Sequence, residues 1–255
     1  MLRKDQMKNE PVLTGTADPA EVSRFNALAD EWWKPNGAFT MVHAFNQARV
    51  TWIAERLSSL SQRDPQAPRP LEGMRIIDVG CGAGLVAEPL AKLGASVLGI
   101  DAAERNVAVA ERHARQNNAT VQYRHARPED CGDLAGKFDV VMSLEVVEHV
   151  ADLPAFLEQL TRLSAPGGIV LIGTINRTMR SYVKAIVGAE YVLRLLPRGT
   201  HDWRKFVTPA ELADHLGANG FAAIESWGVV CNPVTWKWSI GRDVSANYLQ
   251  FHRRI

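Results

Sequence analysis

The segment Asp78-Val-Gly-Cys-Gly-Ala-Gly84 (DVGCGAG) overlaps the end of a short apolar stretch, Arg75–Val79, and precedes a helical pattern from Leu85 to Leu93. Glycines let a chain turn tightly and let a ligand come close to the backbone. The first turn of the helix behind them offers N–H groups that have no partner within the helix. A strand, a glycine-rich turn and a helix in this order predict an α/β unit that binds a small molecule at the turn.

The pattern of strands alternating with helices continues beyond this unit. Short apolar runs predict strands at 75–79, 96–100, 121–125, 138–142 and 169–172, and helical patterns at 85–93, 104–117 and 154–164 separate most of them. Such alternation is typical of a parallel sheet covered by helices on both faces. A helix at 209–216 and strands at 221–230 and 247–253 complete the predicted sheet of seven strands.

The chain before this pattern is organised differently. We expect a flexible arm over residues 1–18, a helical cover over 19–60 that begins at the Asp18-Pro19 helix-start signal, and a proline-containing linker over 61–70. From residue 19 to residue 255 the chain is predicted to be a single domain. Its core spans 71–176, an insert follows at 177–205, and a closing helix and strands occupy 206–255.

Composition excludes some classes of function. The net charge of +1 gives no support for binding nucleic acid. The three cysteines are not arranged as metal-binding pairs, and no apolar run reaches the roughly 18–20 residues that a membrane span needs. The polar N-terminus lacks the features of a secretory or transit peptide. We therefore expect a cytoplasmic protein.

The spacing of the glycine loop indicates the kind of ligand. Its glycines run G-x-G-x-G, whereas a dinucleotide site has G-x-G-x-x-G, and no Lys-Ser/Thr pair follows to make a phosphate loop. Asp101 ends the next predicted strand, where a carboxylate can accept bonds from two ribose hydroxyls. A glycine-rich turn without a ligand is the alternative, and Asp78 together with Asp101 argues against it. These residues favour a nucleoside ligand without a pyrophosphate.

This pattern resembles that of class I methyltransferases, which use S-adenosylmethionine, over about residues 72–255. The resemblance implies a Rossmann-like, doubly wound sheet. It also implies that Asp101 holds the ribose and that the backbone of Leu144 lines the pocket. The residues expected around the amino-acid part of the cofactor are Asp78, Gly80, Gly82 and Gly84. The loop 126–130 would lie beside the adenine, although ordinary loop polarity also explains its acidic residues.

A closer resemblance rests on longer stretches, which are Phe25–Gly37, Glu145–His149, Thr174–Arg177, Val187–Tyr191, Gly199–Trp203, Asn232-Pro233 and Asn247-Tyr248. With them the chain is similar to the O-methyltransferase family of ubiquinone biosynthesis. The resemblance implies methylation of 2-polyprenyl-6-hydroxyphenol and of 3-demethylubiquinol, and names a ubiquinone-biosynthesis complex as a candidate partner. It also implies that Arg49 contacts the cofactor, where the alternative is a surface arginine. Gln47 departs from the family, which often has proline there.

The stretch Ser143-Leu-Glu-Val-Val-Glu-His-Val150 carries the candidate catalytic groups. If the chain turns helical here, Glu145, Glu148 and His149 share one helix face. The resemblance implies that the three bind a divalent metal, with Mg²⁺ preferred over Mn²⁺, Zn²⁺ or Fe²⁺, and that Glu145 and His149 act in catalysis. Two alternatives stay open: His149 as a general base without metal, and a purely structural role.

Residues 177–198 form a basic amphipathic segment after the fifth strand. We expect a lid that contacts an anionic membrane, on the inner face of the plasma membrane, where a polyprenyl substrate resides. The alternative is an ordinary lid packed on the protein. Trp32 and Trp33 are predicted either to roof the active site or to pack in the core.

Three other functions compete with this interpretation. One is methylation of a different small phenol or carboxylate by the same fold. Another is an inactive cofactor-binding or lipid-binding protein. A third, an NAD-dependent oxidoreductase, is disfavoured by the glycine spacing.

Overall fold

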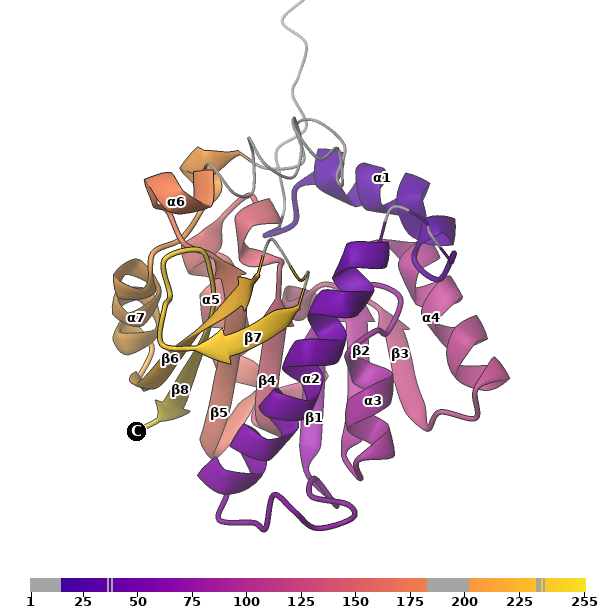
Figure 1. The fold of residues 1–255 in the computed structure, drawn as a ribbon, viewed down its shortest axis with the longest axis horizontal. Coiled ribbons are helices and arrows are strands. Elements are labelled where there is room, and N and C mark those ends of the chain that lie inside the picture. The colour runs from indigo at the N-terminus through magenta and orange to yellow at the C-terminus, as the bar shows by residue number, and fades with distance from the viewer. Residues whose placement is uncertain (1–14, 36, 38, 183–201, 233–234, 236) are drawn as a thin grey trace, which may run out of the picture.

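The computed structural model describes residues 15–35, 37, 39–182, 202–232, 235 and 237–255. Within these residues, eight strands form one sheet in the order β3-β2-β1-β4-β5-β8-β6-β7 (Figure 1). The pairs among β1 to β5 are parallel, and the pairs β5–β8, β8–β6 and β6–β7 are antiparallel. The strands are β1 (Arg75–Val79), β2 (Ser96–Asp101), β3 (Val121–His125), β4 (Phe138–Leu144), β5 (Ser164–Ile175), β6 (Phe221–Cys231), β7 (Trp238–Gly241) and β8 (Asn247–Arg254).

Helices cover both faces of the sheet (Figure 1). The helices are α1 (Pro19–Leu28), α2 (Thr40–Leu60), α3 (Ala87–Lys92), α4 (Glu104–Gln116), α5 (Leu153–Leu163), α6 (Met179–Ser181) and α7 (Pro209–Ala218). Several begin at a side-chain cap. Asp18 caps α1, Asp152 caps α5 and Thr208 caps α7, each with a proline in the first turn. These local signals explain why the sequence predicted the helix starts within a few residues.

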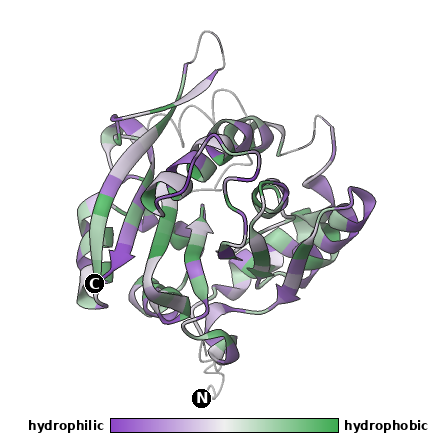
Figure 2. Ribbon diagram, turned by 90° about the horizontal axis from the view of Figure 1, so that it is seen from below, coloured by the Kyte–Doolittle hydropathy of each residue, from purple (hydrophilic) through white to green (hydrophobic). Residues whose placement is uncertain are grey.

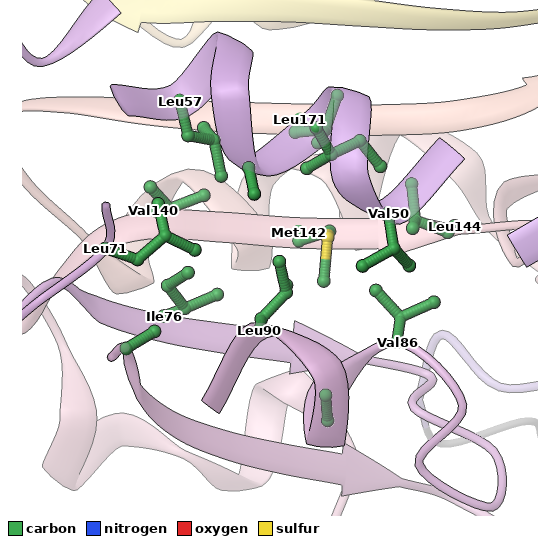
Figure 3. Packing of buried hydrophobic residues seen from close by; sticks show 14 of the residues in the cluster. Val50, Leu57, Leu71, Ile76, Val86, Leu90, Val140, Met142, Leu144 and Leu171 are labelled. Carbon is green, nitrogen blue, oxygen red and sulfur yellow. The ribbon is translucent and has the colours of Figure 1, made fainter. Parts of the chain in front are cut away.

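The core has two main layers, one on each side of the sheet. Residues of α2 and α3 pack against β1, β4 and β5 on one face, as Figure 3 shows for Val50, Leu90 and Met142. Residues of α5 and α7 pack on the other face. The central strands β1, β4 and β5 are buried along most of their length, and in Figure 2 the helices carry both hydrophobic and hydrophilic residues. This is the burial pattern of a sheet covered on both faces.

The predicted fold class is confirmed, and the strand count differs. Strand order reverses between β1 and β4, and in folds of this kind ligands bind beside such a reversal, at the carboxyl edge of the sheet. The sheet has eight strands in the described residues and not seven. The additional strand, β7, arises because β6 continues to Cys231 and pairs with Trp238–Gly241 as a hairpin.

The predicted N-terminal arm and the predicted insert can each be compared with the structure only in part. Residues 15–18 were predicted to belong to a flexible arm, but Ala17 pairs with Val150 and Thr16 is buried, with hydrogen bonds to Glu129. Of the insert 177–205, only 177–182 and 202–205 are described, so the rest of the predicted lid lies outside the described residues. None of the described helices is long and apolar enough to cross a membrane.

Candidate active site

The glycine loop between β1 and α3 is a tight turn packed against the protein's own side chains. Its glycines all have positive φ angles: Gly80 (+80°), Gly82 (+54°) and Gly84 (+85°). Each faces a different neighbour, because a Cβ added to the three positions in turn would meet Val146, Trp32 and Tyr123 at 2.3, 3.1 and 2.1 Å. The loop therefore needs glycine both for its backbone angles and for space.

Asp101 holds this loop in place from the end of β2. One carboxylate oxygen accepts a hydrogen bond from the Gly82 N–H at 2.8 Å, and the other accepts from the Ala103 N–H at 2.7 Å. Desolvation raises the pKa of Asp101, and these two bonds, with one from Asn106, oppose the rise. Asp101 and the glycines thus lie together at the carboxyl edge, as the sequence predicted.

Asp78 and Arg49 are buried charged residues of the candidate site. Asp78, in β1, is 3% exposed, and burial raises its pKa to about 7, with the positive charge of Arg49 opposing the shift. Arg49 comes from α2 and is 2% exposed. Burial lowers the pKa of its guanidinium, and the negative charges of Glu145, Asp78 and Glu148 oppose that shift. The arginine is a buried counter-charge and not a surface residue.

The side chain of Arg49 is held on three sides. Its Nη1 donates to Glu145 Oε1 at 2.7 Å and its Nε donates to Asn46 Oδ1 at 2.8 Å. The guanidinium carbon lies 4.0 Å from the centre of the Phe45 ring. In the structure, Glu145 of the loop after β4 therefore binds Arg49, the arginine that was predicted to contact the cofactor.

The loop after β4 is not the helix that the sequence suggested. Strand β4 ends at Leu144, which is 7% exposed, and Glu145 then adopts a left-handed conformation with φ of +57°. A 3-10 turn follows over Val147–His149. The prediction that Glu145, Glu148 and His149 share one helix face is wrong, because the left-handed residue redirects the chain before the turn begins.

Glu148 is buried beneath this loop. It is 4% exposed, and its Oε2 accepts a hydrogen bond from Thr174 Oγ1 of β5 at 2.8 Å. Burial raises the pKa of Glu148, and the negative charge of Glu145 raises it further. Glu148 and Glu145 are therefore electrostatic neighbours with different environments, since the Glu145 side chain is 28% exposed.

His149 is paired with the N-terminal helix. Its Nδ1 lies 3.0 Å from Glu21 Oε2 of α1, and its ring packs edge-on against Phe25 with centroids 5.5 Å apart. The hydrogen bond with His149 lowers the pKa of Glu21. If Nδ1 carries the proton that faces this carboxylate, the opposite ring nitrogen, Nε2, is the acceptor of the neutral imidazole.

These positions bear on metal binding. Two carboxylates and an imidazole are suitable ligand types for a divalent cation. However, Glu145 contacts Arg49, Glu148 contacts Thr174 and His149 contacts Glu21. Over the described ranges, no three His, Cys, Asp or Glu residues are gathered in a way that could hold a metal ion. The donor types fit a metal, and their arrangement does not.

Several residues that bind these groups were not predicted from the sequence. Glu21 was one acid in a first helical turn, where the helix dipole alone explains an acid, so nothing linked it to His149. Thr174 and Asn106 had weak signals. Thr174 opens one of the family stretches, and Asn106 interrupts the apolar face of α4. The loop 126–130 contributes Glu129, which binds Thr16.

Comparisons with known proteins identify the fold and the family. The sequence pattern of the Methyltransferase domain family matches residues 51–226. A structure of magnesium protoporphyrin IX methyltransferase from Synechocystis PCC 6803 with bound SAH matches with a TM-score of 0.65, at 20% identity over 91% of this chain and 95% of that one. This likeness shows the fold: that of the class I methyltransferases dependent on S-adenosylmethionine.

Sequence relatives narrow the class. A ubiquinone biosynthesis O-methyltransferase of Cereibacter sphaeroides is 48% identical over 92% of this chain and 96% of its own. One from Mesorhizobium japonicum is 48% identical over 92% of this chain and 94% of its own. The chain belongs to the ubiquinone biosynthesis O-methyltransferase family.

Proposed function

We propose that the protein transfers a methyl group from S-adenosylmethionine to the phenolic hydroxyl of two polyprenyl phenols, 2-polyprenyl-6-hydroxyphenol and 3-demethylubiquinol. The observation that carries the proposal is the family relationship, at 48% identity over 92% of the chain. The structure supports it by placing the glycine loop, Asp101 and the loop after β4 at one edge of the sheet.

The protein's own residues have two tasks in this reaction. Asp101 would hold the ribose, and the glycine loop would pack against the amino-acid part of the cofactor. Arg49 would bind the amino-acid carboxylate once Glu145 releases it. Methyl transfer then breaks the sulfur–methyl bond and forms an oxygen–methyl bond, while the phenolic proton must leave. A phenol with a pKa near 10 is largely protonated at neutral pH, so a base beside it raises the rate. His149, with Nδ1 held by Glu21, is the proposed base.

A divalent cation is the finer part of the proposal. A bound cation would lower the pKa of the phenol, and Glu145, Glu148 and His149 supply suitable ligand types. Within the described residues these groups do not form a metal site, so the proposal of a cation rests on their ligand types. Binding requires Glu145 to leave Arg49 and His149 to leave Glu21, since both are engaged.

The test is methyl transfer to a short-tailed demethylubiquinol, kept reduced, after chelator treatment and after addition of Mg²⁺, Mn²⁺ or Zn²⁺. Activity that is lost on stripping and restored by metal supports both substrate and cation. Full activity after verified metal removal keeps the substrate and refutes the cation. Absence of activity with cofactor still bound refutes the acceptor.

Contact with an anionic membrane through residues 177–198 is also part of the proposal. Two of its basic residues are already paired on the protein: Arg177 with Glu211, and Arg180 with Asp243 at 2.7 Å. The other basic residues of the segment are Lys184, Arg194 and Arg198. Substituting these three by Glu should reduce flotation with anionic liposomes, whereas Arg180→Ala, the matched control, should float like wild type. Equal flotation of all variants would refute lipid binding.

A further inference from the structure

The adjacent tryptophans Trp32 and Trp33 both contact the glycine loop, but by different routes. Trp33 donates from Nε1 to the Ala83 carbonyl at 3.0 Å, and its ring stacks on His113 with centroids 3.4 Å apart. Trp32 stacks on Phe39 with centroids 3.8 Å apart. Its ring is also the neighbour that a Cβ on Gly82 would meet. Neither of the two sequence alternatives, roof or core, describes this placement fully.

Trp32 begins a chain of hydrogen bonds that ends on Asp101. Its Nε1 donates to Asn106 Oδ1 at 3.0 Å, and Asn106 Nδ2 donates to Asp101 Oδ1 at 3.4 Å. An indole N–H can only donate, so the amide oxygen of Asn106 must face Trp32 and its NH₂ must face Asp101. Asn106 is 2% exposed, so bulk water cannot replace the indole as its partner.

The chain closes into a ring. The other carboxylate oxygen of Asp101 accepts from the N–H of Gly82, and Gly82 lies against the Trp32 ring. The backbone before the indole is also held, because His43 Nε2 lies 2.7 Å from the Trp32 carbonyl oxygen. The N-terminal cover thereby contacts the carboxylate that ends β2 through one buried amide.

We propose that Trp32 is a cofactor-positioning residue, whose indole N–H fixes the amide of Asn106 and thereby the orientation of the Asp101 carboxylate toward the ribose hydroxyls. The inference deepens the proposed function, because it rests on Asp101 binding the ribose. It assigns to the N-terminal cover a role in binding the nucleoside. Trp32 touches neither reacting atom in this role and acts through Asn106.

The two tryptophans supply a matched experiment. Trp32→Phe and Trp33→Phe each keep an aromatic ring and delete one N–H donor. Only the N–H of Trp32 is connected to Asp101 through hydrogen bonds, because the N–H of Trp33 donates to a backbone carbonyl. Calorimetry with S-adenosylhomocysteine measures the binding affinity of each variant, and thermal unfolding without ligand measures its stability.

We expect Trp32→Phe to raise the Kd for S-adenosylhomocysteine about three- to tenfold, the effect of one neutral hydrogen bond. KM for S-adenosylmethionine should rise with it, while KM for the phenol stays unchanged. In an Asn106→Ala background, Trp32→Phe should have no further effect on the Kd, whereas the effect of Trp33→Phe should persist undiminished.

Two results would overturn the inference. One is an unchanged Kd for Trp32→Phe, or a rise equal to that of Trp33→Phe at equal loss of stability. The other is full additivity of Trp32→Phe with Asn106→Ala. If Asn106→Ala does not fold, the comparison of the two single tryptophan variants decides. Because affinity is measured with the product, loss of methyl transfer to every phenol would refute the proposed function and leave this test standing.

Discussion

The glycine loop and the loop after β4 lie at the same edge of the sheet, and they are built in opposite ways. The glycine loop is fixed by backbone angles, close contacts and N–H bonds to Asp101. The loop after β4 is fixed by charges, and its partners come from α1, α2 and β5. The first is held by backbone geometry, and the second is a set of ionisable groups that other elements hold in place.

The largest expected effect separates chemistry from binding. His149→Gln should lower kcat about 10²–10⁴-fold, the usual contribution of a general base. The affinity for S-adenosylhomocysteine should stay near that of wild type, because His149 pairs with Glu21 and packs on Phe25, both in α1. Steady-state kinetics and calorimetry check the two halves. A loss of affinity comparable to the loss of kcat would show that the loop after β4 also contributes to cofactor binding.

Arg49 connects the two regions, so its loss should reach both. Arg49→Met leaves buried carboxylates without their counter-charge and should cost about 3–5 kcal/mol of unfolding free energy. Arg56→Met on the same helix is the control. That arginine pairs with Glu225 and its side chain is 33% exposed, so the cost should be about 1 kcal/mol or less. Urea denaturation of both variants would show whether burial makes the difference.

The steric contact between the two loops can be tested by a pair of substitutions. Gly80→Ala forces a side chain into a left-handed position, which costs about 1–2 kcal/mol, and pushes it into Val146. Overpacking adds about 1–3 kcal/mol. In the double variant Gly80→Ala/Val146→Ala, the cost of overpacking should be recovered, and the cost of the left-handed backbone should remain. Complete rescue would mean that space alone requires glycine there.

The smallest expected effect concerns pH. The pKa of Asp78 is about 7 in the folded protein and about 4 unfolded, so the folded state holds one more proton between these values. Stability therefore falls as pH rises through this window, and returning from pH 8 to pH 6 should recover about 1 kcal/mol. Asp78→Asn should lack this component in denaturation without cofactor. An identical pH slope in wild type and variant would contradict the pKa.

The difference between the loops also explains what the sequence could predict. The turn with Gly80, Gly82 and Gly84, and the strand-end position of Asp101, follow from local rules about backbone angles and element order. The pairs Arg49–Glu145 and His149–Glu21 join residues about a hundred positions apart, and no local rule selects the partner. The helix expected over 145–149 failed because only tertiary contacts hold Glu145 in a left-handed conformation. The additional strand β7 likewise depends on pairing with β6.

The buried carboxyl groups around Arg49 have a consequence for how the site exchanges its ligands. Burial raises the pKa of both Asp78 and Glu148 to about 7, so near neutral pH each group is only partly ionised. If the methyl donor binds with its positively charged sulfonium beside them, it would favour their ionised forms, whereas the uncharged thioether left after transfer would not. Binding of the methyl donor should therefore release protons to solvent and binding of the spent product should release fewer. Calorimetry in buffers of different ionisation enthalpy would count them. The site would then distinguish the methyl donor from the product by the number of protons released on binding as well as by shape.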